Sequence, residues 1–180
     1  MSGTDIVARD KAFARLLEDH KAILYKVAYT YCREAEARRD LMQEMCIQLW
    51  RALPGYDDGA GVKRSTWVTR VVMNVAISGL RTATRRNRHE IPAEAIGIDI
   101  DAAMHLDDAP SDNMRALRQL IDAMDELNRA LILLYLEGYD AEEIANVLGI
   151  SPSNVTTRMT RLKQKLTVQF ADINSAGEPQ

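Results

Sequence analysis

The stretch AEEIANVLGISPSNVTTRMTRLKQKL, residues 141–166, constrains the fold more than any other part of the chain. Asp140 can cap the helix that follows, and the Glu143 side chain can reach back to the cap, an arrangement known as a capping box. Gly149 then allows a tight turn, because glycine adopts left-handed backbone angles without a steric cost. The pattern predicts a short helix that ends at about Leu148.

A second helix start follows the turn directly. Ser151 can act as its N-cap, and Pro152 occupies the first helical position, where a missing N–H loses no hydrogen bond. The apolar residues beyond it are spaced by four, three and four, so they share one helix face: Val155, Met159, Leu162 and Leu166. Two helices that meet across a glycine turn, the second with one apolar face, predict a helix-turn-helix.

The outward face of this second helix carries positive charge. Residues 151–170 contain four Lys or Arg and no Asp or Glu, although the whole chain has a formal net charge of -3. Hydroxyls, amides and arginines can donate hydrogen bonds to base edges and phosphates without adding negative charge. The predicted DNA-binding residues on this helix are Ser153, Asn154, Thr157, Arg158 and Arg161. The alternative is a solvated basic helix whose charges only keep the protein in solution.

Helical periodicity runs through the rest of the chain, and no stretch alternates as a strand would. The first helix is expected from about Phe13 to Tyr31 and the second at about 37–52. Ser65 caps the third, which has Trp67 on its inner face. Leu117 to Leu127 mark the fourth, and the fifth is ALILLYLEG, closed by Gly138.

Charge divides these helices into two groups. Residues 61–90 hold seven Lys or Arg against one acid, whereas residues 91–114 hold six acids and no Lys or Arg. The segment 91–113 also lacks steady periodicity, which is typical of a linker. We therefore expect an all-α protein of two small helical domains, residues 1–90 and 114–180, joined by this acidic linker.

Several classes of function are disfavoured. No apolar run approaches the roughly 18 to 20 residues of a membrane span, and the N-terminus lacks the layout of a secretion signal, so we expect a cytoplasmic protein with no membrane partner. Cys32 and Cys46 have no metal-ligand spacing and are expected to be reduced core thiols. A helical metalloenzyme would need paired carboxylates and histidines, and His20, His89 and His105 have no such context. We expect no cofactor, no metal and no catalytic residues.

Two further segments make the chain resemble a known family. DLMQEMCIQLWRAL (residues 40–53) is followed by STWVTRVVMNVAISGLR (residues 65–81), and both precede the helix-turn-helix. In this order they resemble the extracytoplasmic-function sigma factors of bacterial RNA polymerase, in the sigma-70 family, over about residues 10–170. The resemblance implies an initiation factor that binds core RNA polymerase and promoter DNA. Family members often have an anti-sigma inhibitor, which is a further candidate partner.

The resemblance also implies roles for residues outside the helix-turn-helix. The first segment is similar to the family's polymerase-docking helix, and its candidate contacts are Asp40, Gln43 and Glu44, whereas Trp50 is expected in the core. The loop at residues 54–64 and the helix after it resemble the part that opens and reads the minus-ten element. The candidates there are Tyr56, which would stack on a flipped base, and Lys63, Arg64, Arg70, Asn74, Arg81, Arg85, Arg86 and Arg88.

Alternatives remain for several of these assignments. The acidic residues of the docking helix could form a solvated face, and Asn74 could be buried and bonded to a neighbouring helix. In the family the C-terminal domain reads the minus-thirty-five element. The connector follows the RNA exit path there, although the acidic linker of this chain could equally be a solubilising spacer. Asn128 stands where relatives often have proline, which leaves the helix start there open. The alternative function is a stand-alone helix-turn-helix regulator, which would bind a palindrome as a dimer.

Overall fold

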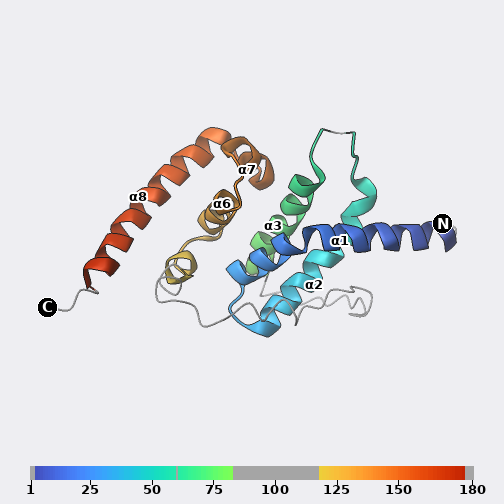
Figure 1. Cartoon of the computed structure of the whole chain (residues 1–180), viewed down its shortest axis with the longest axis horizontal. Coiled ribbons are helices and arrows are strands. Elements are labelled where there is room, and N and C mark those ends of the chain that lie inside the picture. Colours follow the sequence, from blue (N-terminus) through green and yellow to red (C-terminus); the bar gives the residue numbers. More distant parts are fainter. Residues whose placement is uncertain (1–2, 60, 83–117, 177–180) are drawn as a thin grey trace. The chain divides into compact units, whose positions relative to one another are not determined.

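The computed structural model describes residues 3–59, 61–82 and 118–176 (Figure 1). The chain divides into two compact units, Met1–Ala109 and Pro110–Gln180. All secondary-structure elements in the described ranges are helical, which confirms the predicted fold class. The predicted acidic linker, residues 91–113, lies outside the described residues, and the domain limits stay a prediction.

The described part of the first unit is a three-helix arrangement. It consists of α1 (Gly3–Tyr31), α2 (Ala35–Ala52) and α3 (Arg64–Thr82), with the short 3-10 helix η1 (Leu53–Gly55) after α2. Each α-helix contacts the other two. Their core is apolar and includes the fully buried Leu17, Leu24, Val27, Met45, Leu49, Val68, Val72 and Met73. Each such side chain contributes about 1.5–3 kcal/mol by burial, so packing anchors both ends of the loop between α2 and α3.

In the second unit, α6 (Glu126–Leu136), α7 (Ala141–Leu148) and α8 (Pro152–Ala176) pack against one another (Figure 1). As predicted, Gly138 follows α6 with a left-handed φ of 82°. The next N–H, that of Tyr139, returns to the Leu134 carbonyl at 3.1 Å, which closes the helix end. The buried residues that join the three helices are Leu131, Leu134, Ile144, Val147, Val155, Met159 and Leu162.

Some of the predicted helix limits differ from the structure. α3 begins at Arg64, so Ser65 lies inside the helix and does not cap it. The predicted fourth helix does not reach Leu127, because the helix at residues 118–122 ends and α6 begins after Asp125. The Asp125 side chain accepts hydrogen bonds from the Asn128 N–H (2.8 Å) and from Asn128 Nδ2 (2.6 Å). Asp125 is thus the N-cap at the start that the sequence left open, and the apolar spacing runs across it unchanged.

Candidate nucleic-acid interface

The turn between α7 and α8 has the local geometry that the sequence predicts. Asp140 Oδ1 accepts from the Glu143 N–H (2.8 Å), and Glu143 Oε2 accepts from the Asp140 N–H (3.2 Å), so both halves of the capping box are present. Gly149 has a left-handed φ of 68°. Ser151 Oγ then accepts from the Asn154 N–H at 3.3 Å. These bonds satisfy donors at two helix starts and fix the residue at which α8 begins.

The side chains of α8 divide into an inner and an outer set. Of the four residues of the predicted inner face, Val155, Met159 and Leu162 are buried and Leu166 is half-buried. Of the predicted DNA-binding residues, Arg158 is half-buried and the other four are exposed: Ser153, Asn154, Thr157 and Arg161. Arg158 Nε donates to Asn154 Oδ1 at 3.0 Å, so the amide holds the guanidinium along the helix surface.

Four of these five residues line one open hollow. They are Asn154, Thr157, Arg158 and Arg161, and the rest of the lining is Asn128, Leu162 and Lys165. Among the described residues, the lining contains three cations and no carboxylate, a composition that favours a phosphate backbone.

Asn128 and Lys165 are missing from the sequence-based candidates. Lys165 stands four residues after Arg161, and that spacing, which places both on one helix face, was a usable signal. Asn128 comes from the first turn of α6, and its position in the hollow depends on how α6 packs against α8, which no local pattern encodes.

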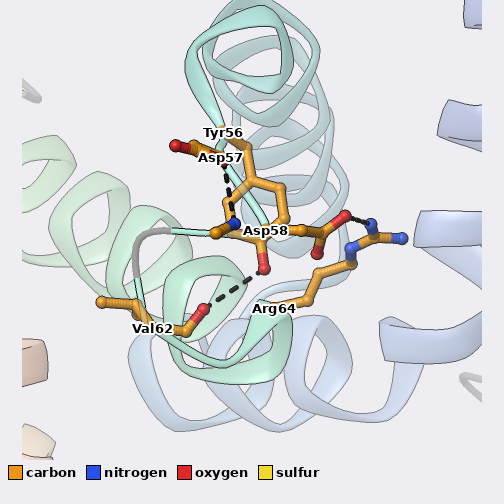
Figure 2. A network of polar contacts seen from close by, with 6 residues as sticks. Tyr56, Asp57, Asp58, Val62 and Arg64 are labelled. Atoms are coloured by element: carbon orange, nitrogen blue, oxygen red, sulfur yellow. Dashed lines mark hydrogen bonds and ion pairs between the residues drawn. The ribbon is translucent and has the colours of Figure 1, made fainter.

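The loop between α2 and α3 is closed by its own polar contacts, as Figure 2 shows. The Tyr56 hydroxyl donates to the Val62 carbonyl at 3.2 Å. Asp57 Oδ1 accepts from the Gly59 N–H at 2.8 Å, and Gly61 has a left-handed φ of 74°. The loop therefore holds Tyr56 in a defined position near the start of α3.

Tyr56 forms an aromatic pair with Trp67. Their ring centroids are 4.9 Å apart with a tilt of 43°, and both side chains are half-buried. Burial is the largest cause that raises the pKa of the Tyr56 hydroxyl, so the hydroxyl stays protonated at neutral pH and continues to donate to the Val62 carbonyl. The sequence placed Trp67 in the core because of its spacing along α3, and the pairing with a loop residue gave no sequence signal.

The two predicted cations of this loop have different surroundings. Lys63 and Arg64 are both exposed, and Arg64 Nη2 forms an ion pair with Asp58 Oδ2 at 2.5 Å (Figure 2). The Arg64 guanidinium also lies 5.3 Å from the centroid of the Tyr56 ring. Hydrogen bonds to Asp58, and then to Tyr56, raise the pKa of Arg64, which therefore stays charged.

Along α3, the outer candidates are only partly described. Arg70 is half-buried and Asn74 is exposed, so the alternative of a buried Asn74 is wrong. Asn74 lies seven residues after Trp67, two helical turns, so it shares a face with the aromatic pair. Arg81 belongs to the last turn of α3, beyond the described side chains, and the predicted backbone contacts Arg85, Arg86 and Arg88 lie outside the described residues.

On α2, the three predicted polymerase contacts are spaced by three and one residues, so they lie on one side of the helix. Asp40 and Glu44 are exposed and Gln43 is half-buried. Glu44 Oε1 accepts a hydrogen bond from Gln48 Nε2 at 2.7 Å.

Trp50, farther along α2, makes internal contacts. It is half-buried and meets Phe13 edge-on at 5.1 Å between centroids. The Arg9 guanidinium lies 4.0 Å above its ring and donates to its carbonyl at 2.8 Å. The ring thus ties α1 to α2.

Other kinds of site find little support in the described ranges. There, no group of three or more His, Cys, Asp or Glu could hold a metal ion. Cys46 is buried, and burial raises the pKa of its thiol to about 12, while Cys32 is half-buried; both are free cysteines. None of the described helices combines the length and apolar character needed to cross a membrane.

Comparison with known proteins assigns each unit to a conserved module. The family model of Sigma-70 region 2 matches residues 16–86, and that of Sigma-70 region 4 matches residues 114–166. Together they cover more than half of the chain. The chain belongs to the sigma-70 family. The first match contains α2, the loop and α3, and the second contains α6, α7 and most of α8.

The curated relatives place this sigma-70 member in the extracytoplasmic-function (ECF) group. It is 29% identical to the ECF RNA polymerase sigma factor SigE of Mycolicibacterium smegmatis, over 89% of this chain and 62% of that protein. It is 23% identical to the ECF factor SigW of Bacillus subtilis, over 90% of both. It is 25% identical to the probable sigma factor RfaY of Xanthomonas campestris, of which it spans only 39%. The chain thus spans less than two thirds of RfaY and of SigE.

Two solved structures have the same fold. One is the sigma factor RpoE in complex with the anti-sigma factor NepR from Bartonella quintana, with a TM-score of 0.65 and 15% identity over 89% of this chain and 98% of that one. The other is CnrH in complex with the cytosolic domain of CnrY, with a TM-score of 0.60 and 20% identity over 93% and 90%.

Proposed function

We propose that this protein is a sigma factor that binds core RNA polymerase and directs it to specific promoters, which it recognises and helps to open. The observation that carries the proposal is the pair of matches to sigma-70 regions 2 and 4, one on each helical unit and in that order. The protein itself would perform no catalytic step and would act in the cytoplasm, where the polymerase works. The three cations that line the hollow on α8 support a DNA partner.

The α8 surface would read the minus-thirty-five element in the major groove. Its N-terminal half carries the exposed Ser153, Asn154 and Thr157, which have donors and acceptors suited to base edges. Arg158, Arg161 and Lys165 supply positive charge for the backbone or for guanine.

The loop and α3 would bind the minus-ten element as a single strand. Flipping one base out of a duplex costs a few kcal/mol, and stacking that base on an aromatic ring offsets about 1–3 kcal/mol. The Tyr56–Trp67 pair supplies aromatic surface held by the loop, and Asn74 lies on the same side of α3. Lys63, Arg64 and Arg70, with Arg81, Arg85, Arg86 and Arg88, would contact the backbone.

The side of α2 that carries Asp40, Gln43 and Glu44 would join these surfaces to the polymerase. Exposed carboxylates of Asp40 and Glu44 are suited to bidentate bonds from arginines on a partner, with Gln43 between them. An anti-sigma protein would regulate the factor by covering one of these surfaces, a proposal supported by the complex that the structurally similar RpoE forms with the anti-sigma factor NepR. The acidic segment at 91–113 would follow the RNA exit path.

Run-off transcription tests the proposal. Core polymerase is incubated with a promoter library, with or without the purified full chain, and the transcripts are sequenced. We expect transcripts that depend on the chain and share two elements upstream of their starts. A D40A/E44A variant should lose core binding, whereas Arg158→Ala should retain core binding and lose promoter selection. No association with core, together with tight binding of the chain alone to a palindromic duplex, would instead identify a stand-alone regulator.

A further inference from the structure

Asp58 has no role in the proposed function, although it lies where a DNA strand is expected. It sits in the α2–α3 loop beside Tyr56, and its carboxylate would repel a phosphate backbone. Figure 2 shows that this carboxylate instead faces Arg64, with Oδ2 2.5 Å from Nη2. The positive charge of Arg64 is therefore already balanced by the Asp58 carboxylate before any DNA binds.

The loop geometry makes this pairing possible. Asp58 and Arg64 are six residues apart, and the chain between them turns back at Gly61 with its left-handed φ of 74°. The bond from the Gly59 N–H to Asp57 and the bond from Tyr56 to the Val62 carbonyl close the same turn. The guanidinium thus stays close to the Tyr56 ring, where the backbone of a strand whose base stacks on that ring would pass.

A carboxylate and a phosphate compete for the same donors. Both accept hydrogen bonds from the planar guanidinium in the same forked geometry. Arg64 therefore cannot satisfy both ligands fully with one edge, and a strand must displace Asp58 to gain that contact.

We propose that Asp58 occupies Arg64 as an internal competitor of the DNA strand, so that the loop binds single-stranded DNA only by exchanging the carboxylate for a phosphate. This inference rests on the proposed function, because the strand is the one that the loop would capture. Asp58 would then lower the affinity for backbone alone and make capture depend more on the stacked base.

The exchange has a small cost because the pair is open to solvent. The Asp58 side chain is 70% exposed and that of Arg64 is 50% exposed. Exposed ion pairs change an equilibrium constant by at most about fivefold, and salt weakens them. Asp58 would therefore tune the affinity without blocking the site.

The neighbouring aspartate is a matched control. Asp58→Asn and Asp57→Asn each remove one negative charge from the same loop, so they change the long-range field alike. Asn at position 57 keeps the oxygen that accepts from the Gly59 N–H, so the turn is retained. Only Asp58→Asn removes the charged partner of Arg64.

The first measurement tests whether the pair exists without DNA. Urea unfolding of the full chain is compared for Asp58→Asn, Arg64→Gln and the double variant. We expect a non-additive effect of up to about fivefold in the unfolding constant, which shrinks at high salt. Additive effects at low salt overturn the proposal.

The second measurement uses a labelled single-stranded DNA of random sequence, about 20 nucleotides long, because phosphate contacts do not depend on sequence. At about 0.05 M salt we expect Asp58→Asn to bind about threefold to fivefold more tightly than Asp57→Asn. The advantage should shrink at about 0.3 M salt and vanish in the Arg64→Gln background. Equal affinity of the two variants, including no binding by either, overturns the proposal, and so does weaker binding by Asp58→Asn.

Failure of the proposed function would appear elsewhere. If the proposed function is wrong, adding the parent chain will not change run-off transcription. If only the competition is wrong, the DNA affinities of Asp57→Asn and Asp58→Asn will fail to differ as expected. If Asp58 and Arg64 prove to be coupled and Asp58→Asn binds DNA more tightly, but the parent chain supports no transcription, the exchange of carboxylate for phosphate stands and the sigma role is rejected.

Discussion

Asn154 and Arg158 allow a quantitative test of how α8 presents an arginine to DNA. Arg158 Nε donates to Asn154 Oδ1 at 3.0 Å, one helical turn away. The Nη atoms form the outer end of the guanidinium and are the atoms that a guanine would accept from. Asn154 can therefore act in two ways, by touching DNA itself or by holding Arg158 in position.

The two roles predict different energies. Arg158→Ala removes a bidentate contact worth about 1–3 kcal/mol. Asn154→Ala, if the amide only holds the arginine, frees one long side chain that must then be ordered on binding, at about 0.5–1.5 kcal/mol. In that case the double variant binds no more weakly than Arg158→Ala alone, because there is no arginine left to hold. The coupling energy then equals the whole effect of Asn154→Ala.

The assay is binding of reconstituted holoenzyme to a labelled duplex that carries the upstream element found by run-off selection. Gln164→Ala, an exposed change on the same helix outside the predicted set, is the control and should bind as the parent does. Thermal unfolding verifies that each variant is folded. Additive losses would show that Asn154 makes its own contact with DNA, and full affinity of Arg158→Ala would refute the reading role of this arginine.

Three other parts of the protein give further predictions. Asp140→Ala removes the α7 capping box and should destabilise the second unit by about 1 kcal/mol in urea unfolding, while Asn146→Ala, an exposed change in the same helix, should have little effect. Burial is the largest cause that lowers the pKa of His20, and Arg64 lowers it further, although Asp19 raises it. The free energy of unfolding should therefore fall as the pH drops from about 6.5 through the lowered folded-state pKa, and His20→Gln should flatten that dependence. Tyr56→Phe should retain promoter opening because it keeps the ring against Trp67, whereas Tyr56→Ala should reduce it about tenfold or more in potassium permanganate footprinting.

The parts of the site that follow from the sequence are those with local causes. The capping box at Asp140, the glycine turn at Gly149 and the start of α8 each depend on residues within four positions of one another. Their hydrogen bonds compete with few alternatives, so a pattern of residue types is enough to predict them. The exposed set on α8 then follows from the helical period.

The parts that the sequence missed have causes at longer range or in a loop. Trp67 has core spacing along α3, yet its ring meets Tyr56 because the loop folds back over the helix start. Asp58 appears in the sequence as one more loop acid, and its partner is known only once the turn at Gly61 is in place. The helix break at Asp125 was missed for a different reason, since apolar spacing continues unbroken across the cap.

The two proposed DNA surfaces differ in how their positive charge is balanced. The described lining of the α8 hollow includes Arg158, Arg161 and Lys165 and no carboxylate, whereas Arg64 beside the loop is paired with Asp58. The cations of the hollow can attract a duplex without giving up a partner, whereas Arg64 gains a phosphate only when a strand lies close enough to displace Asp58. The Arg64 contact would therefore form only after a strand is already in place. That order suits a protein that must locate a promoter before it opens one.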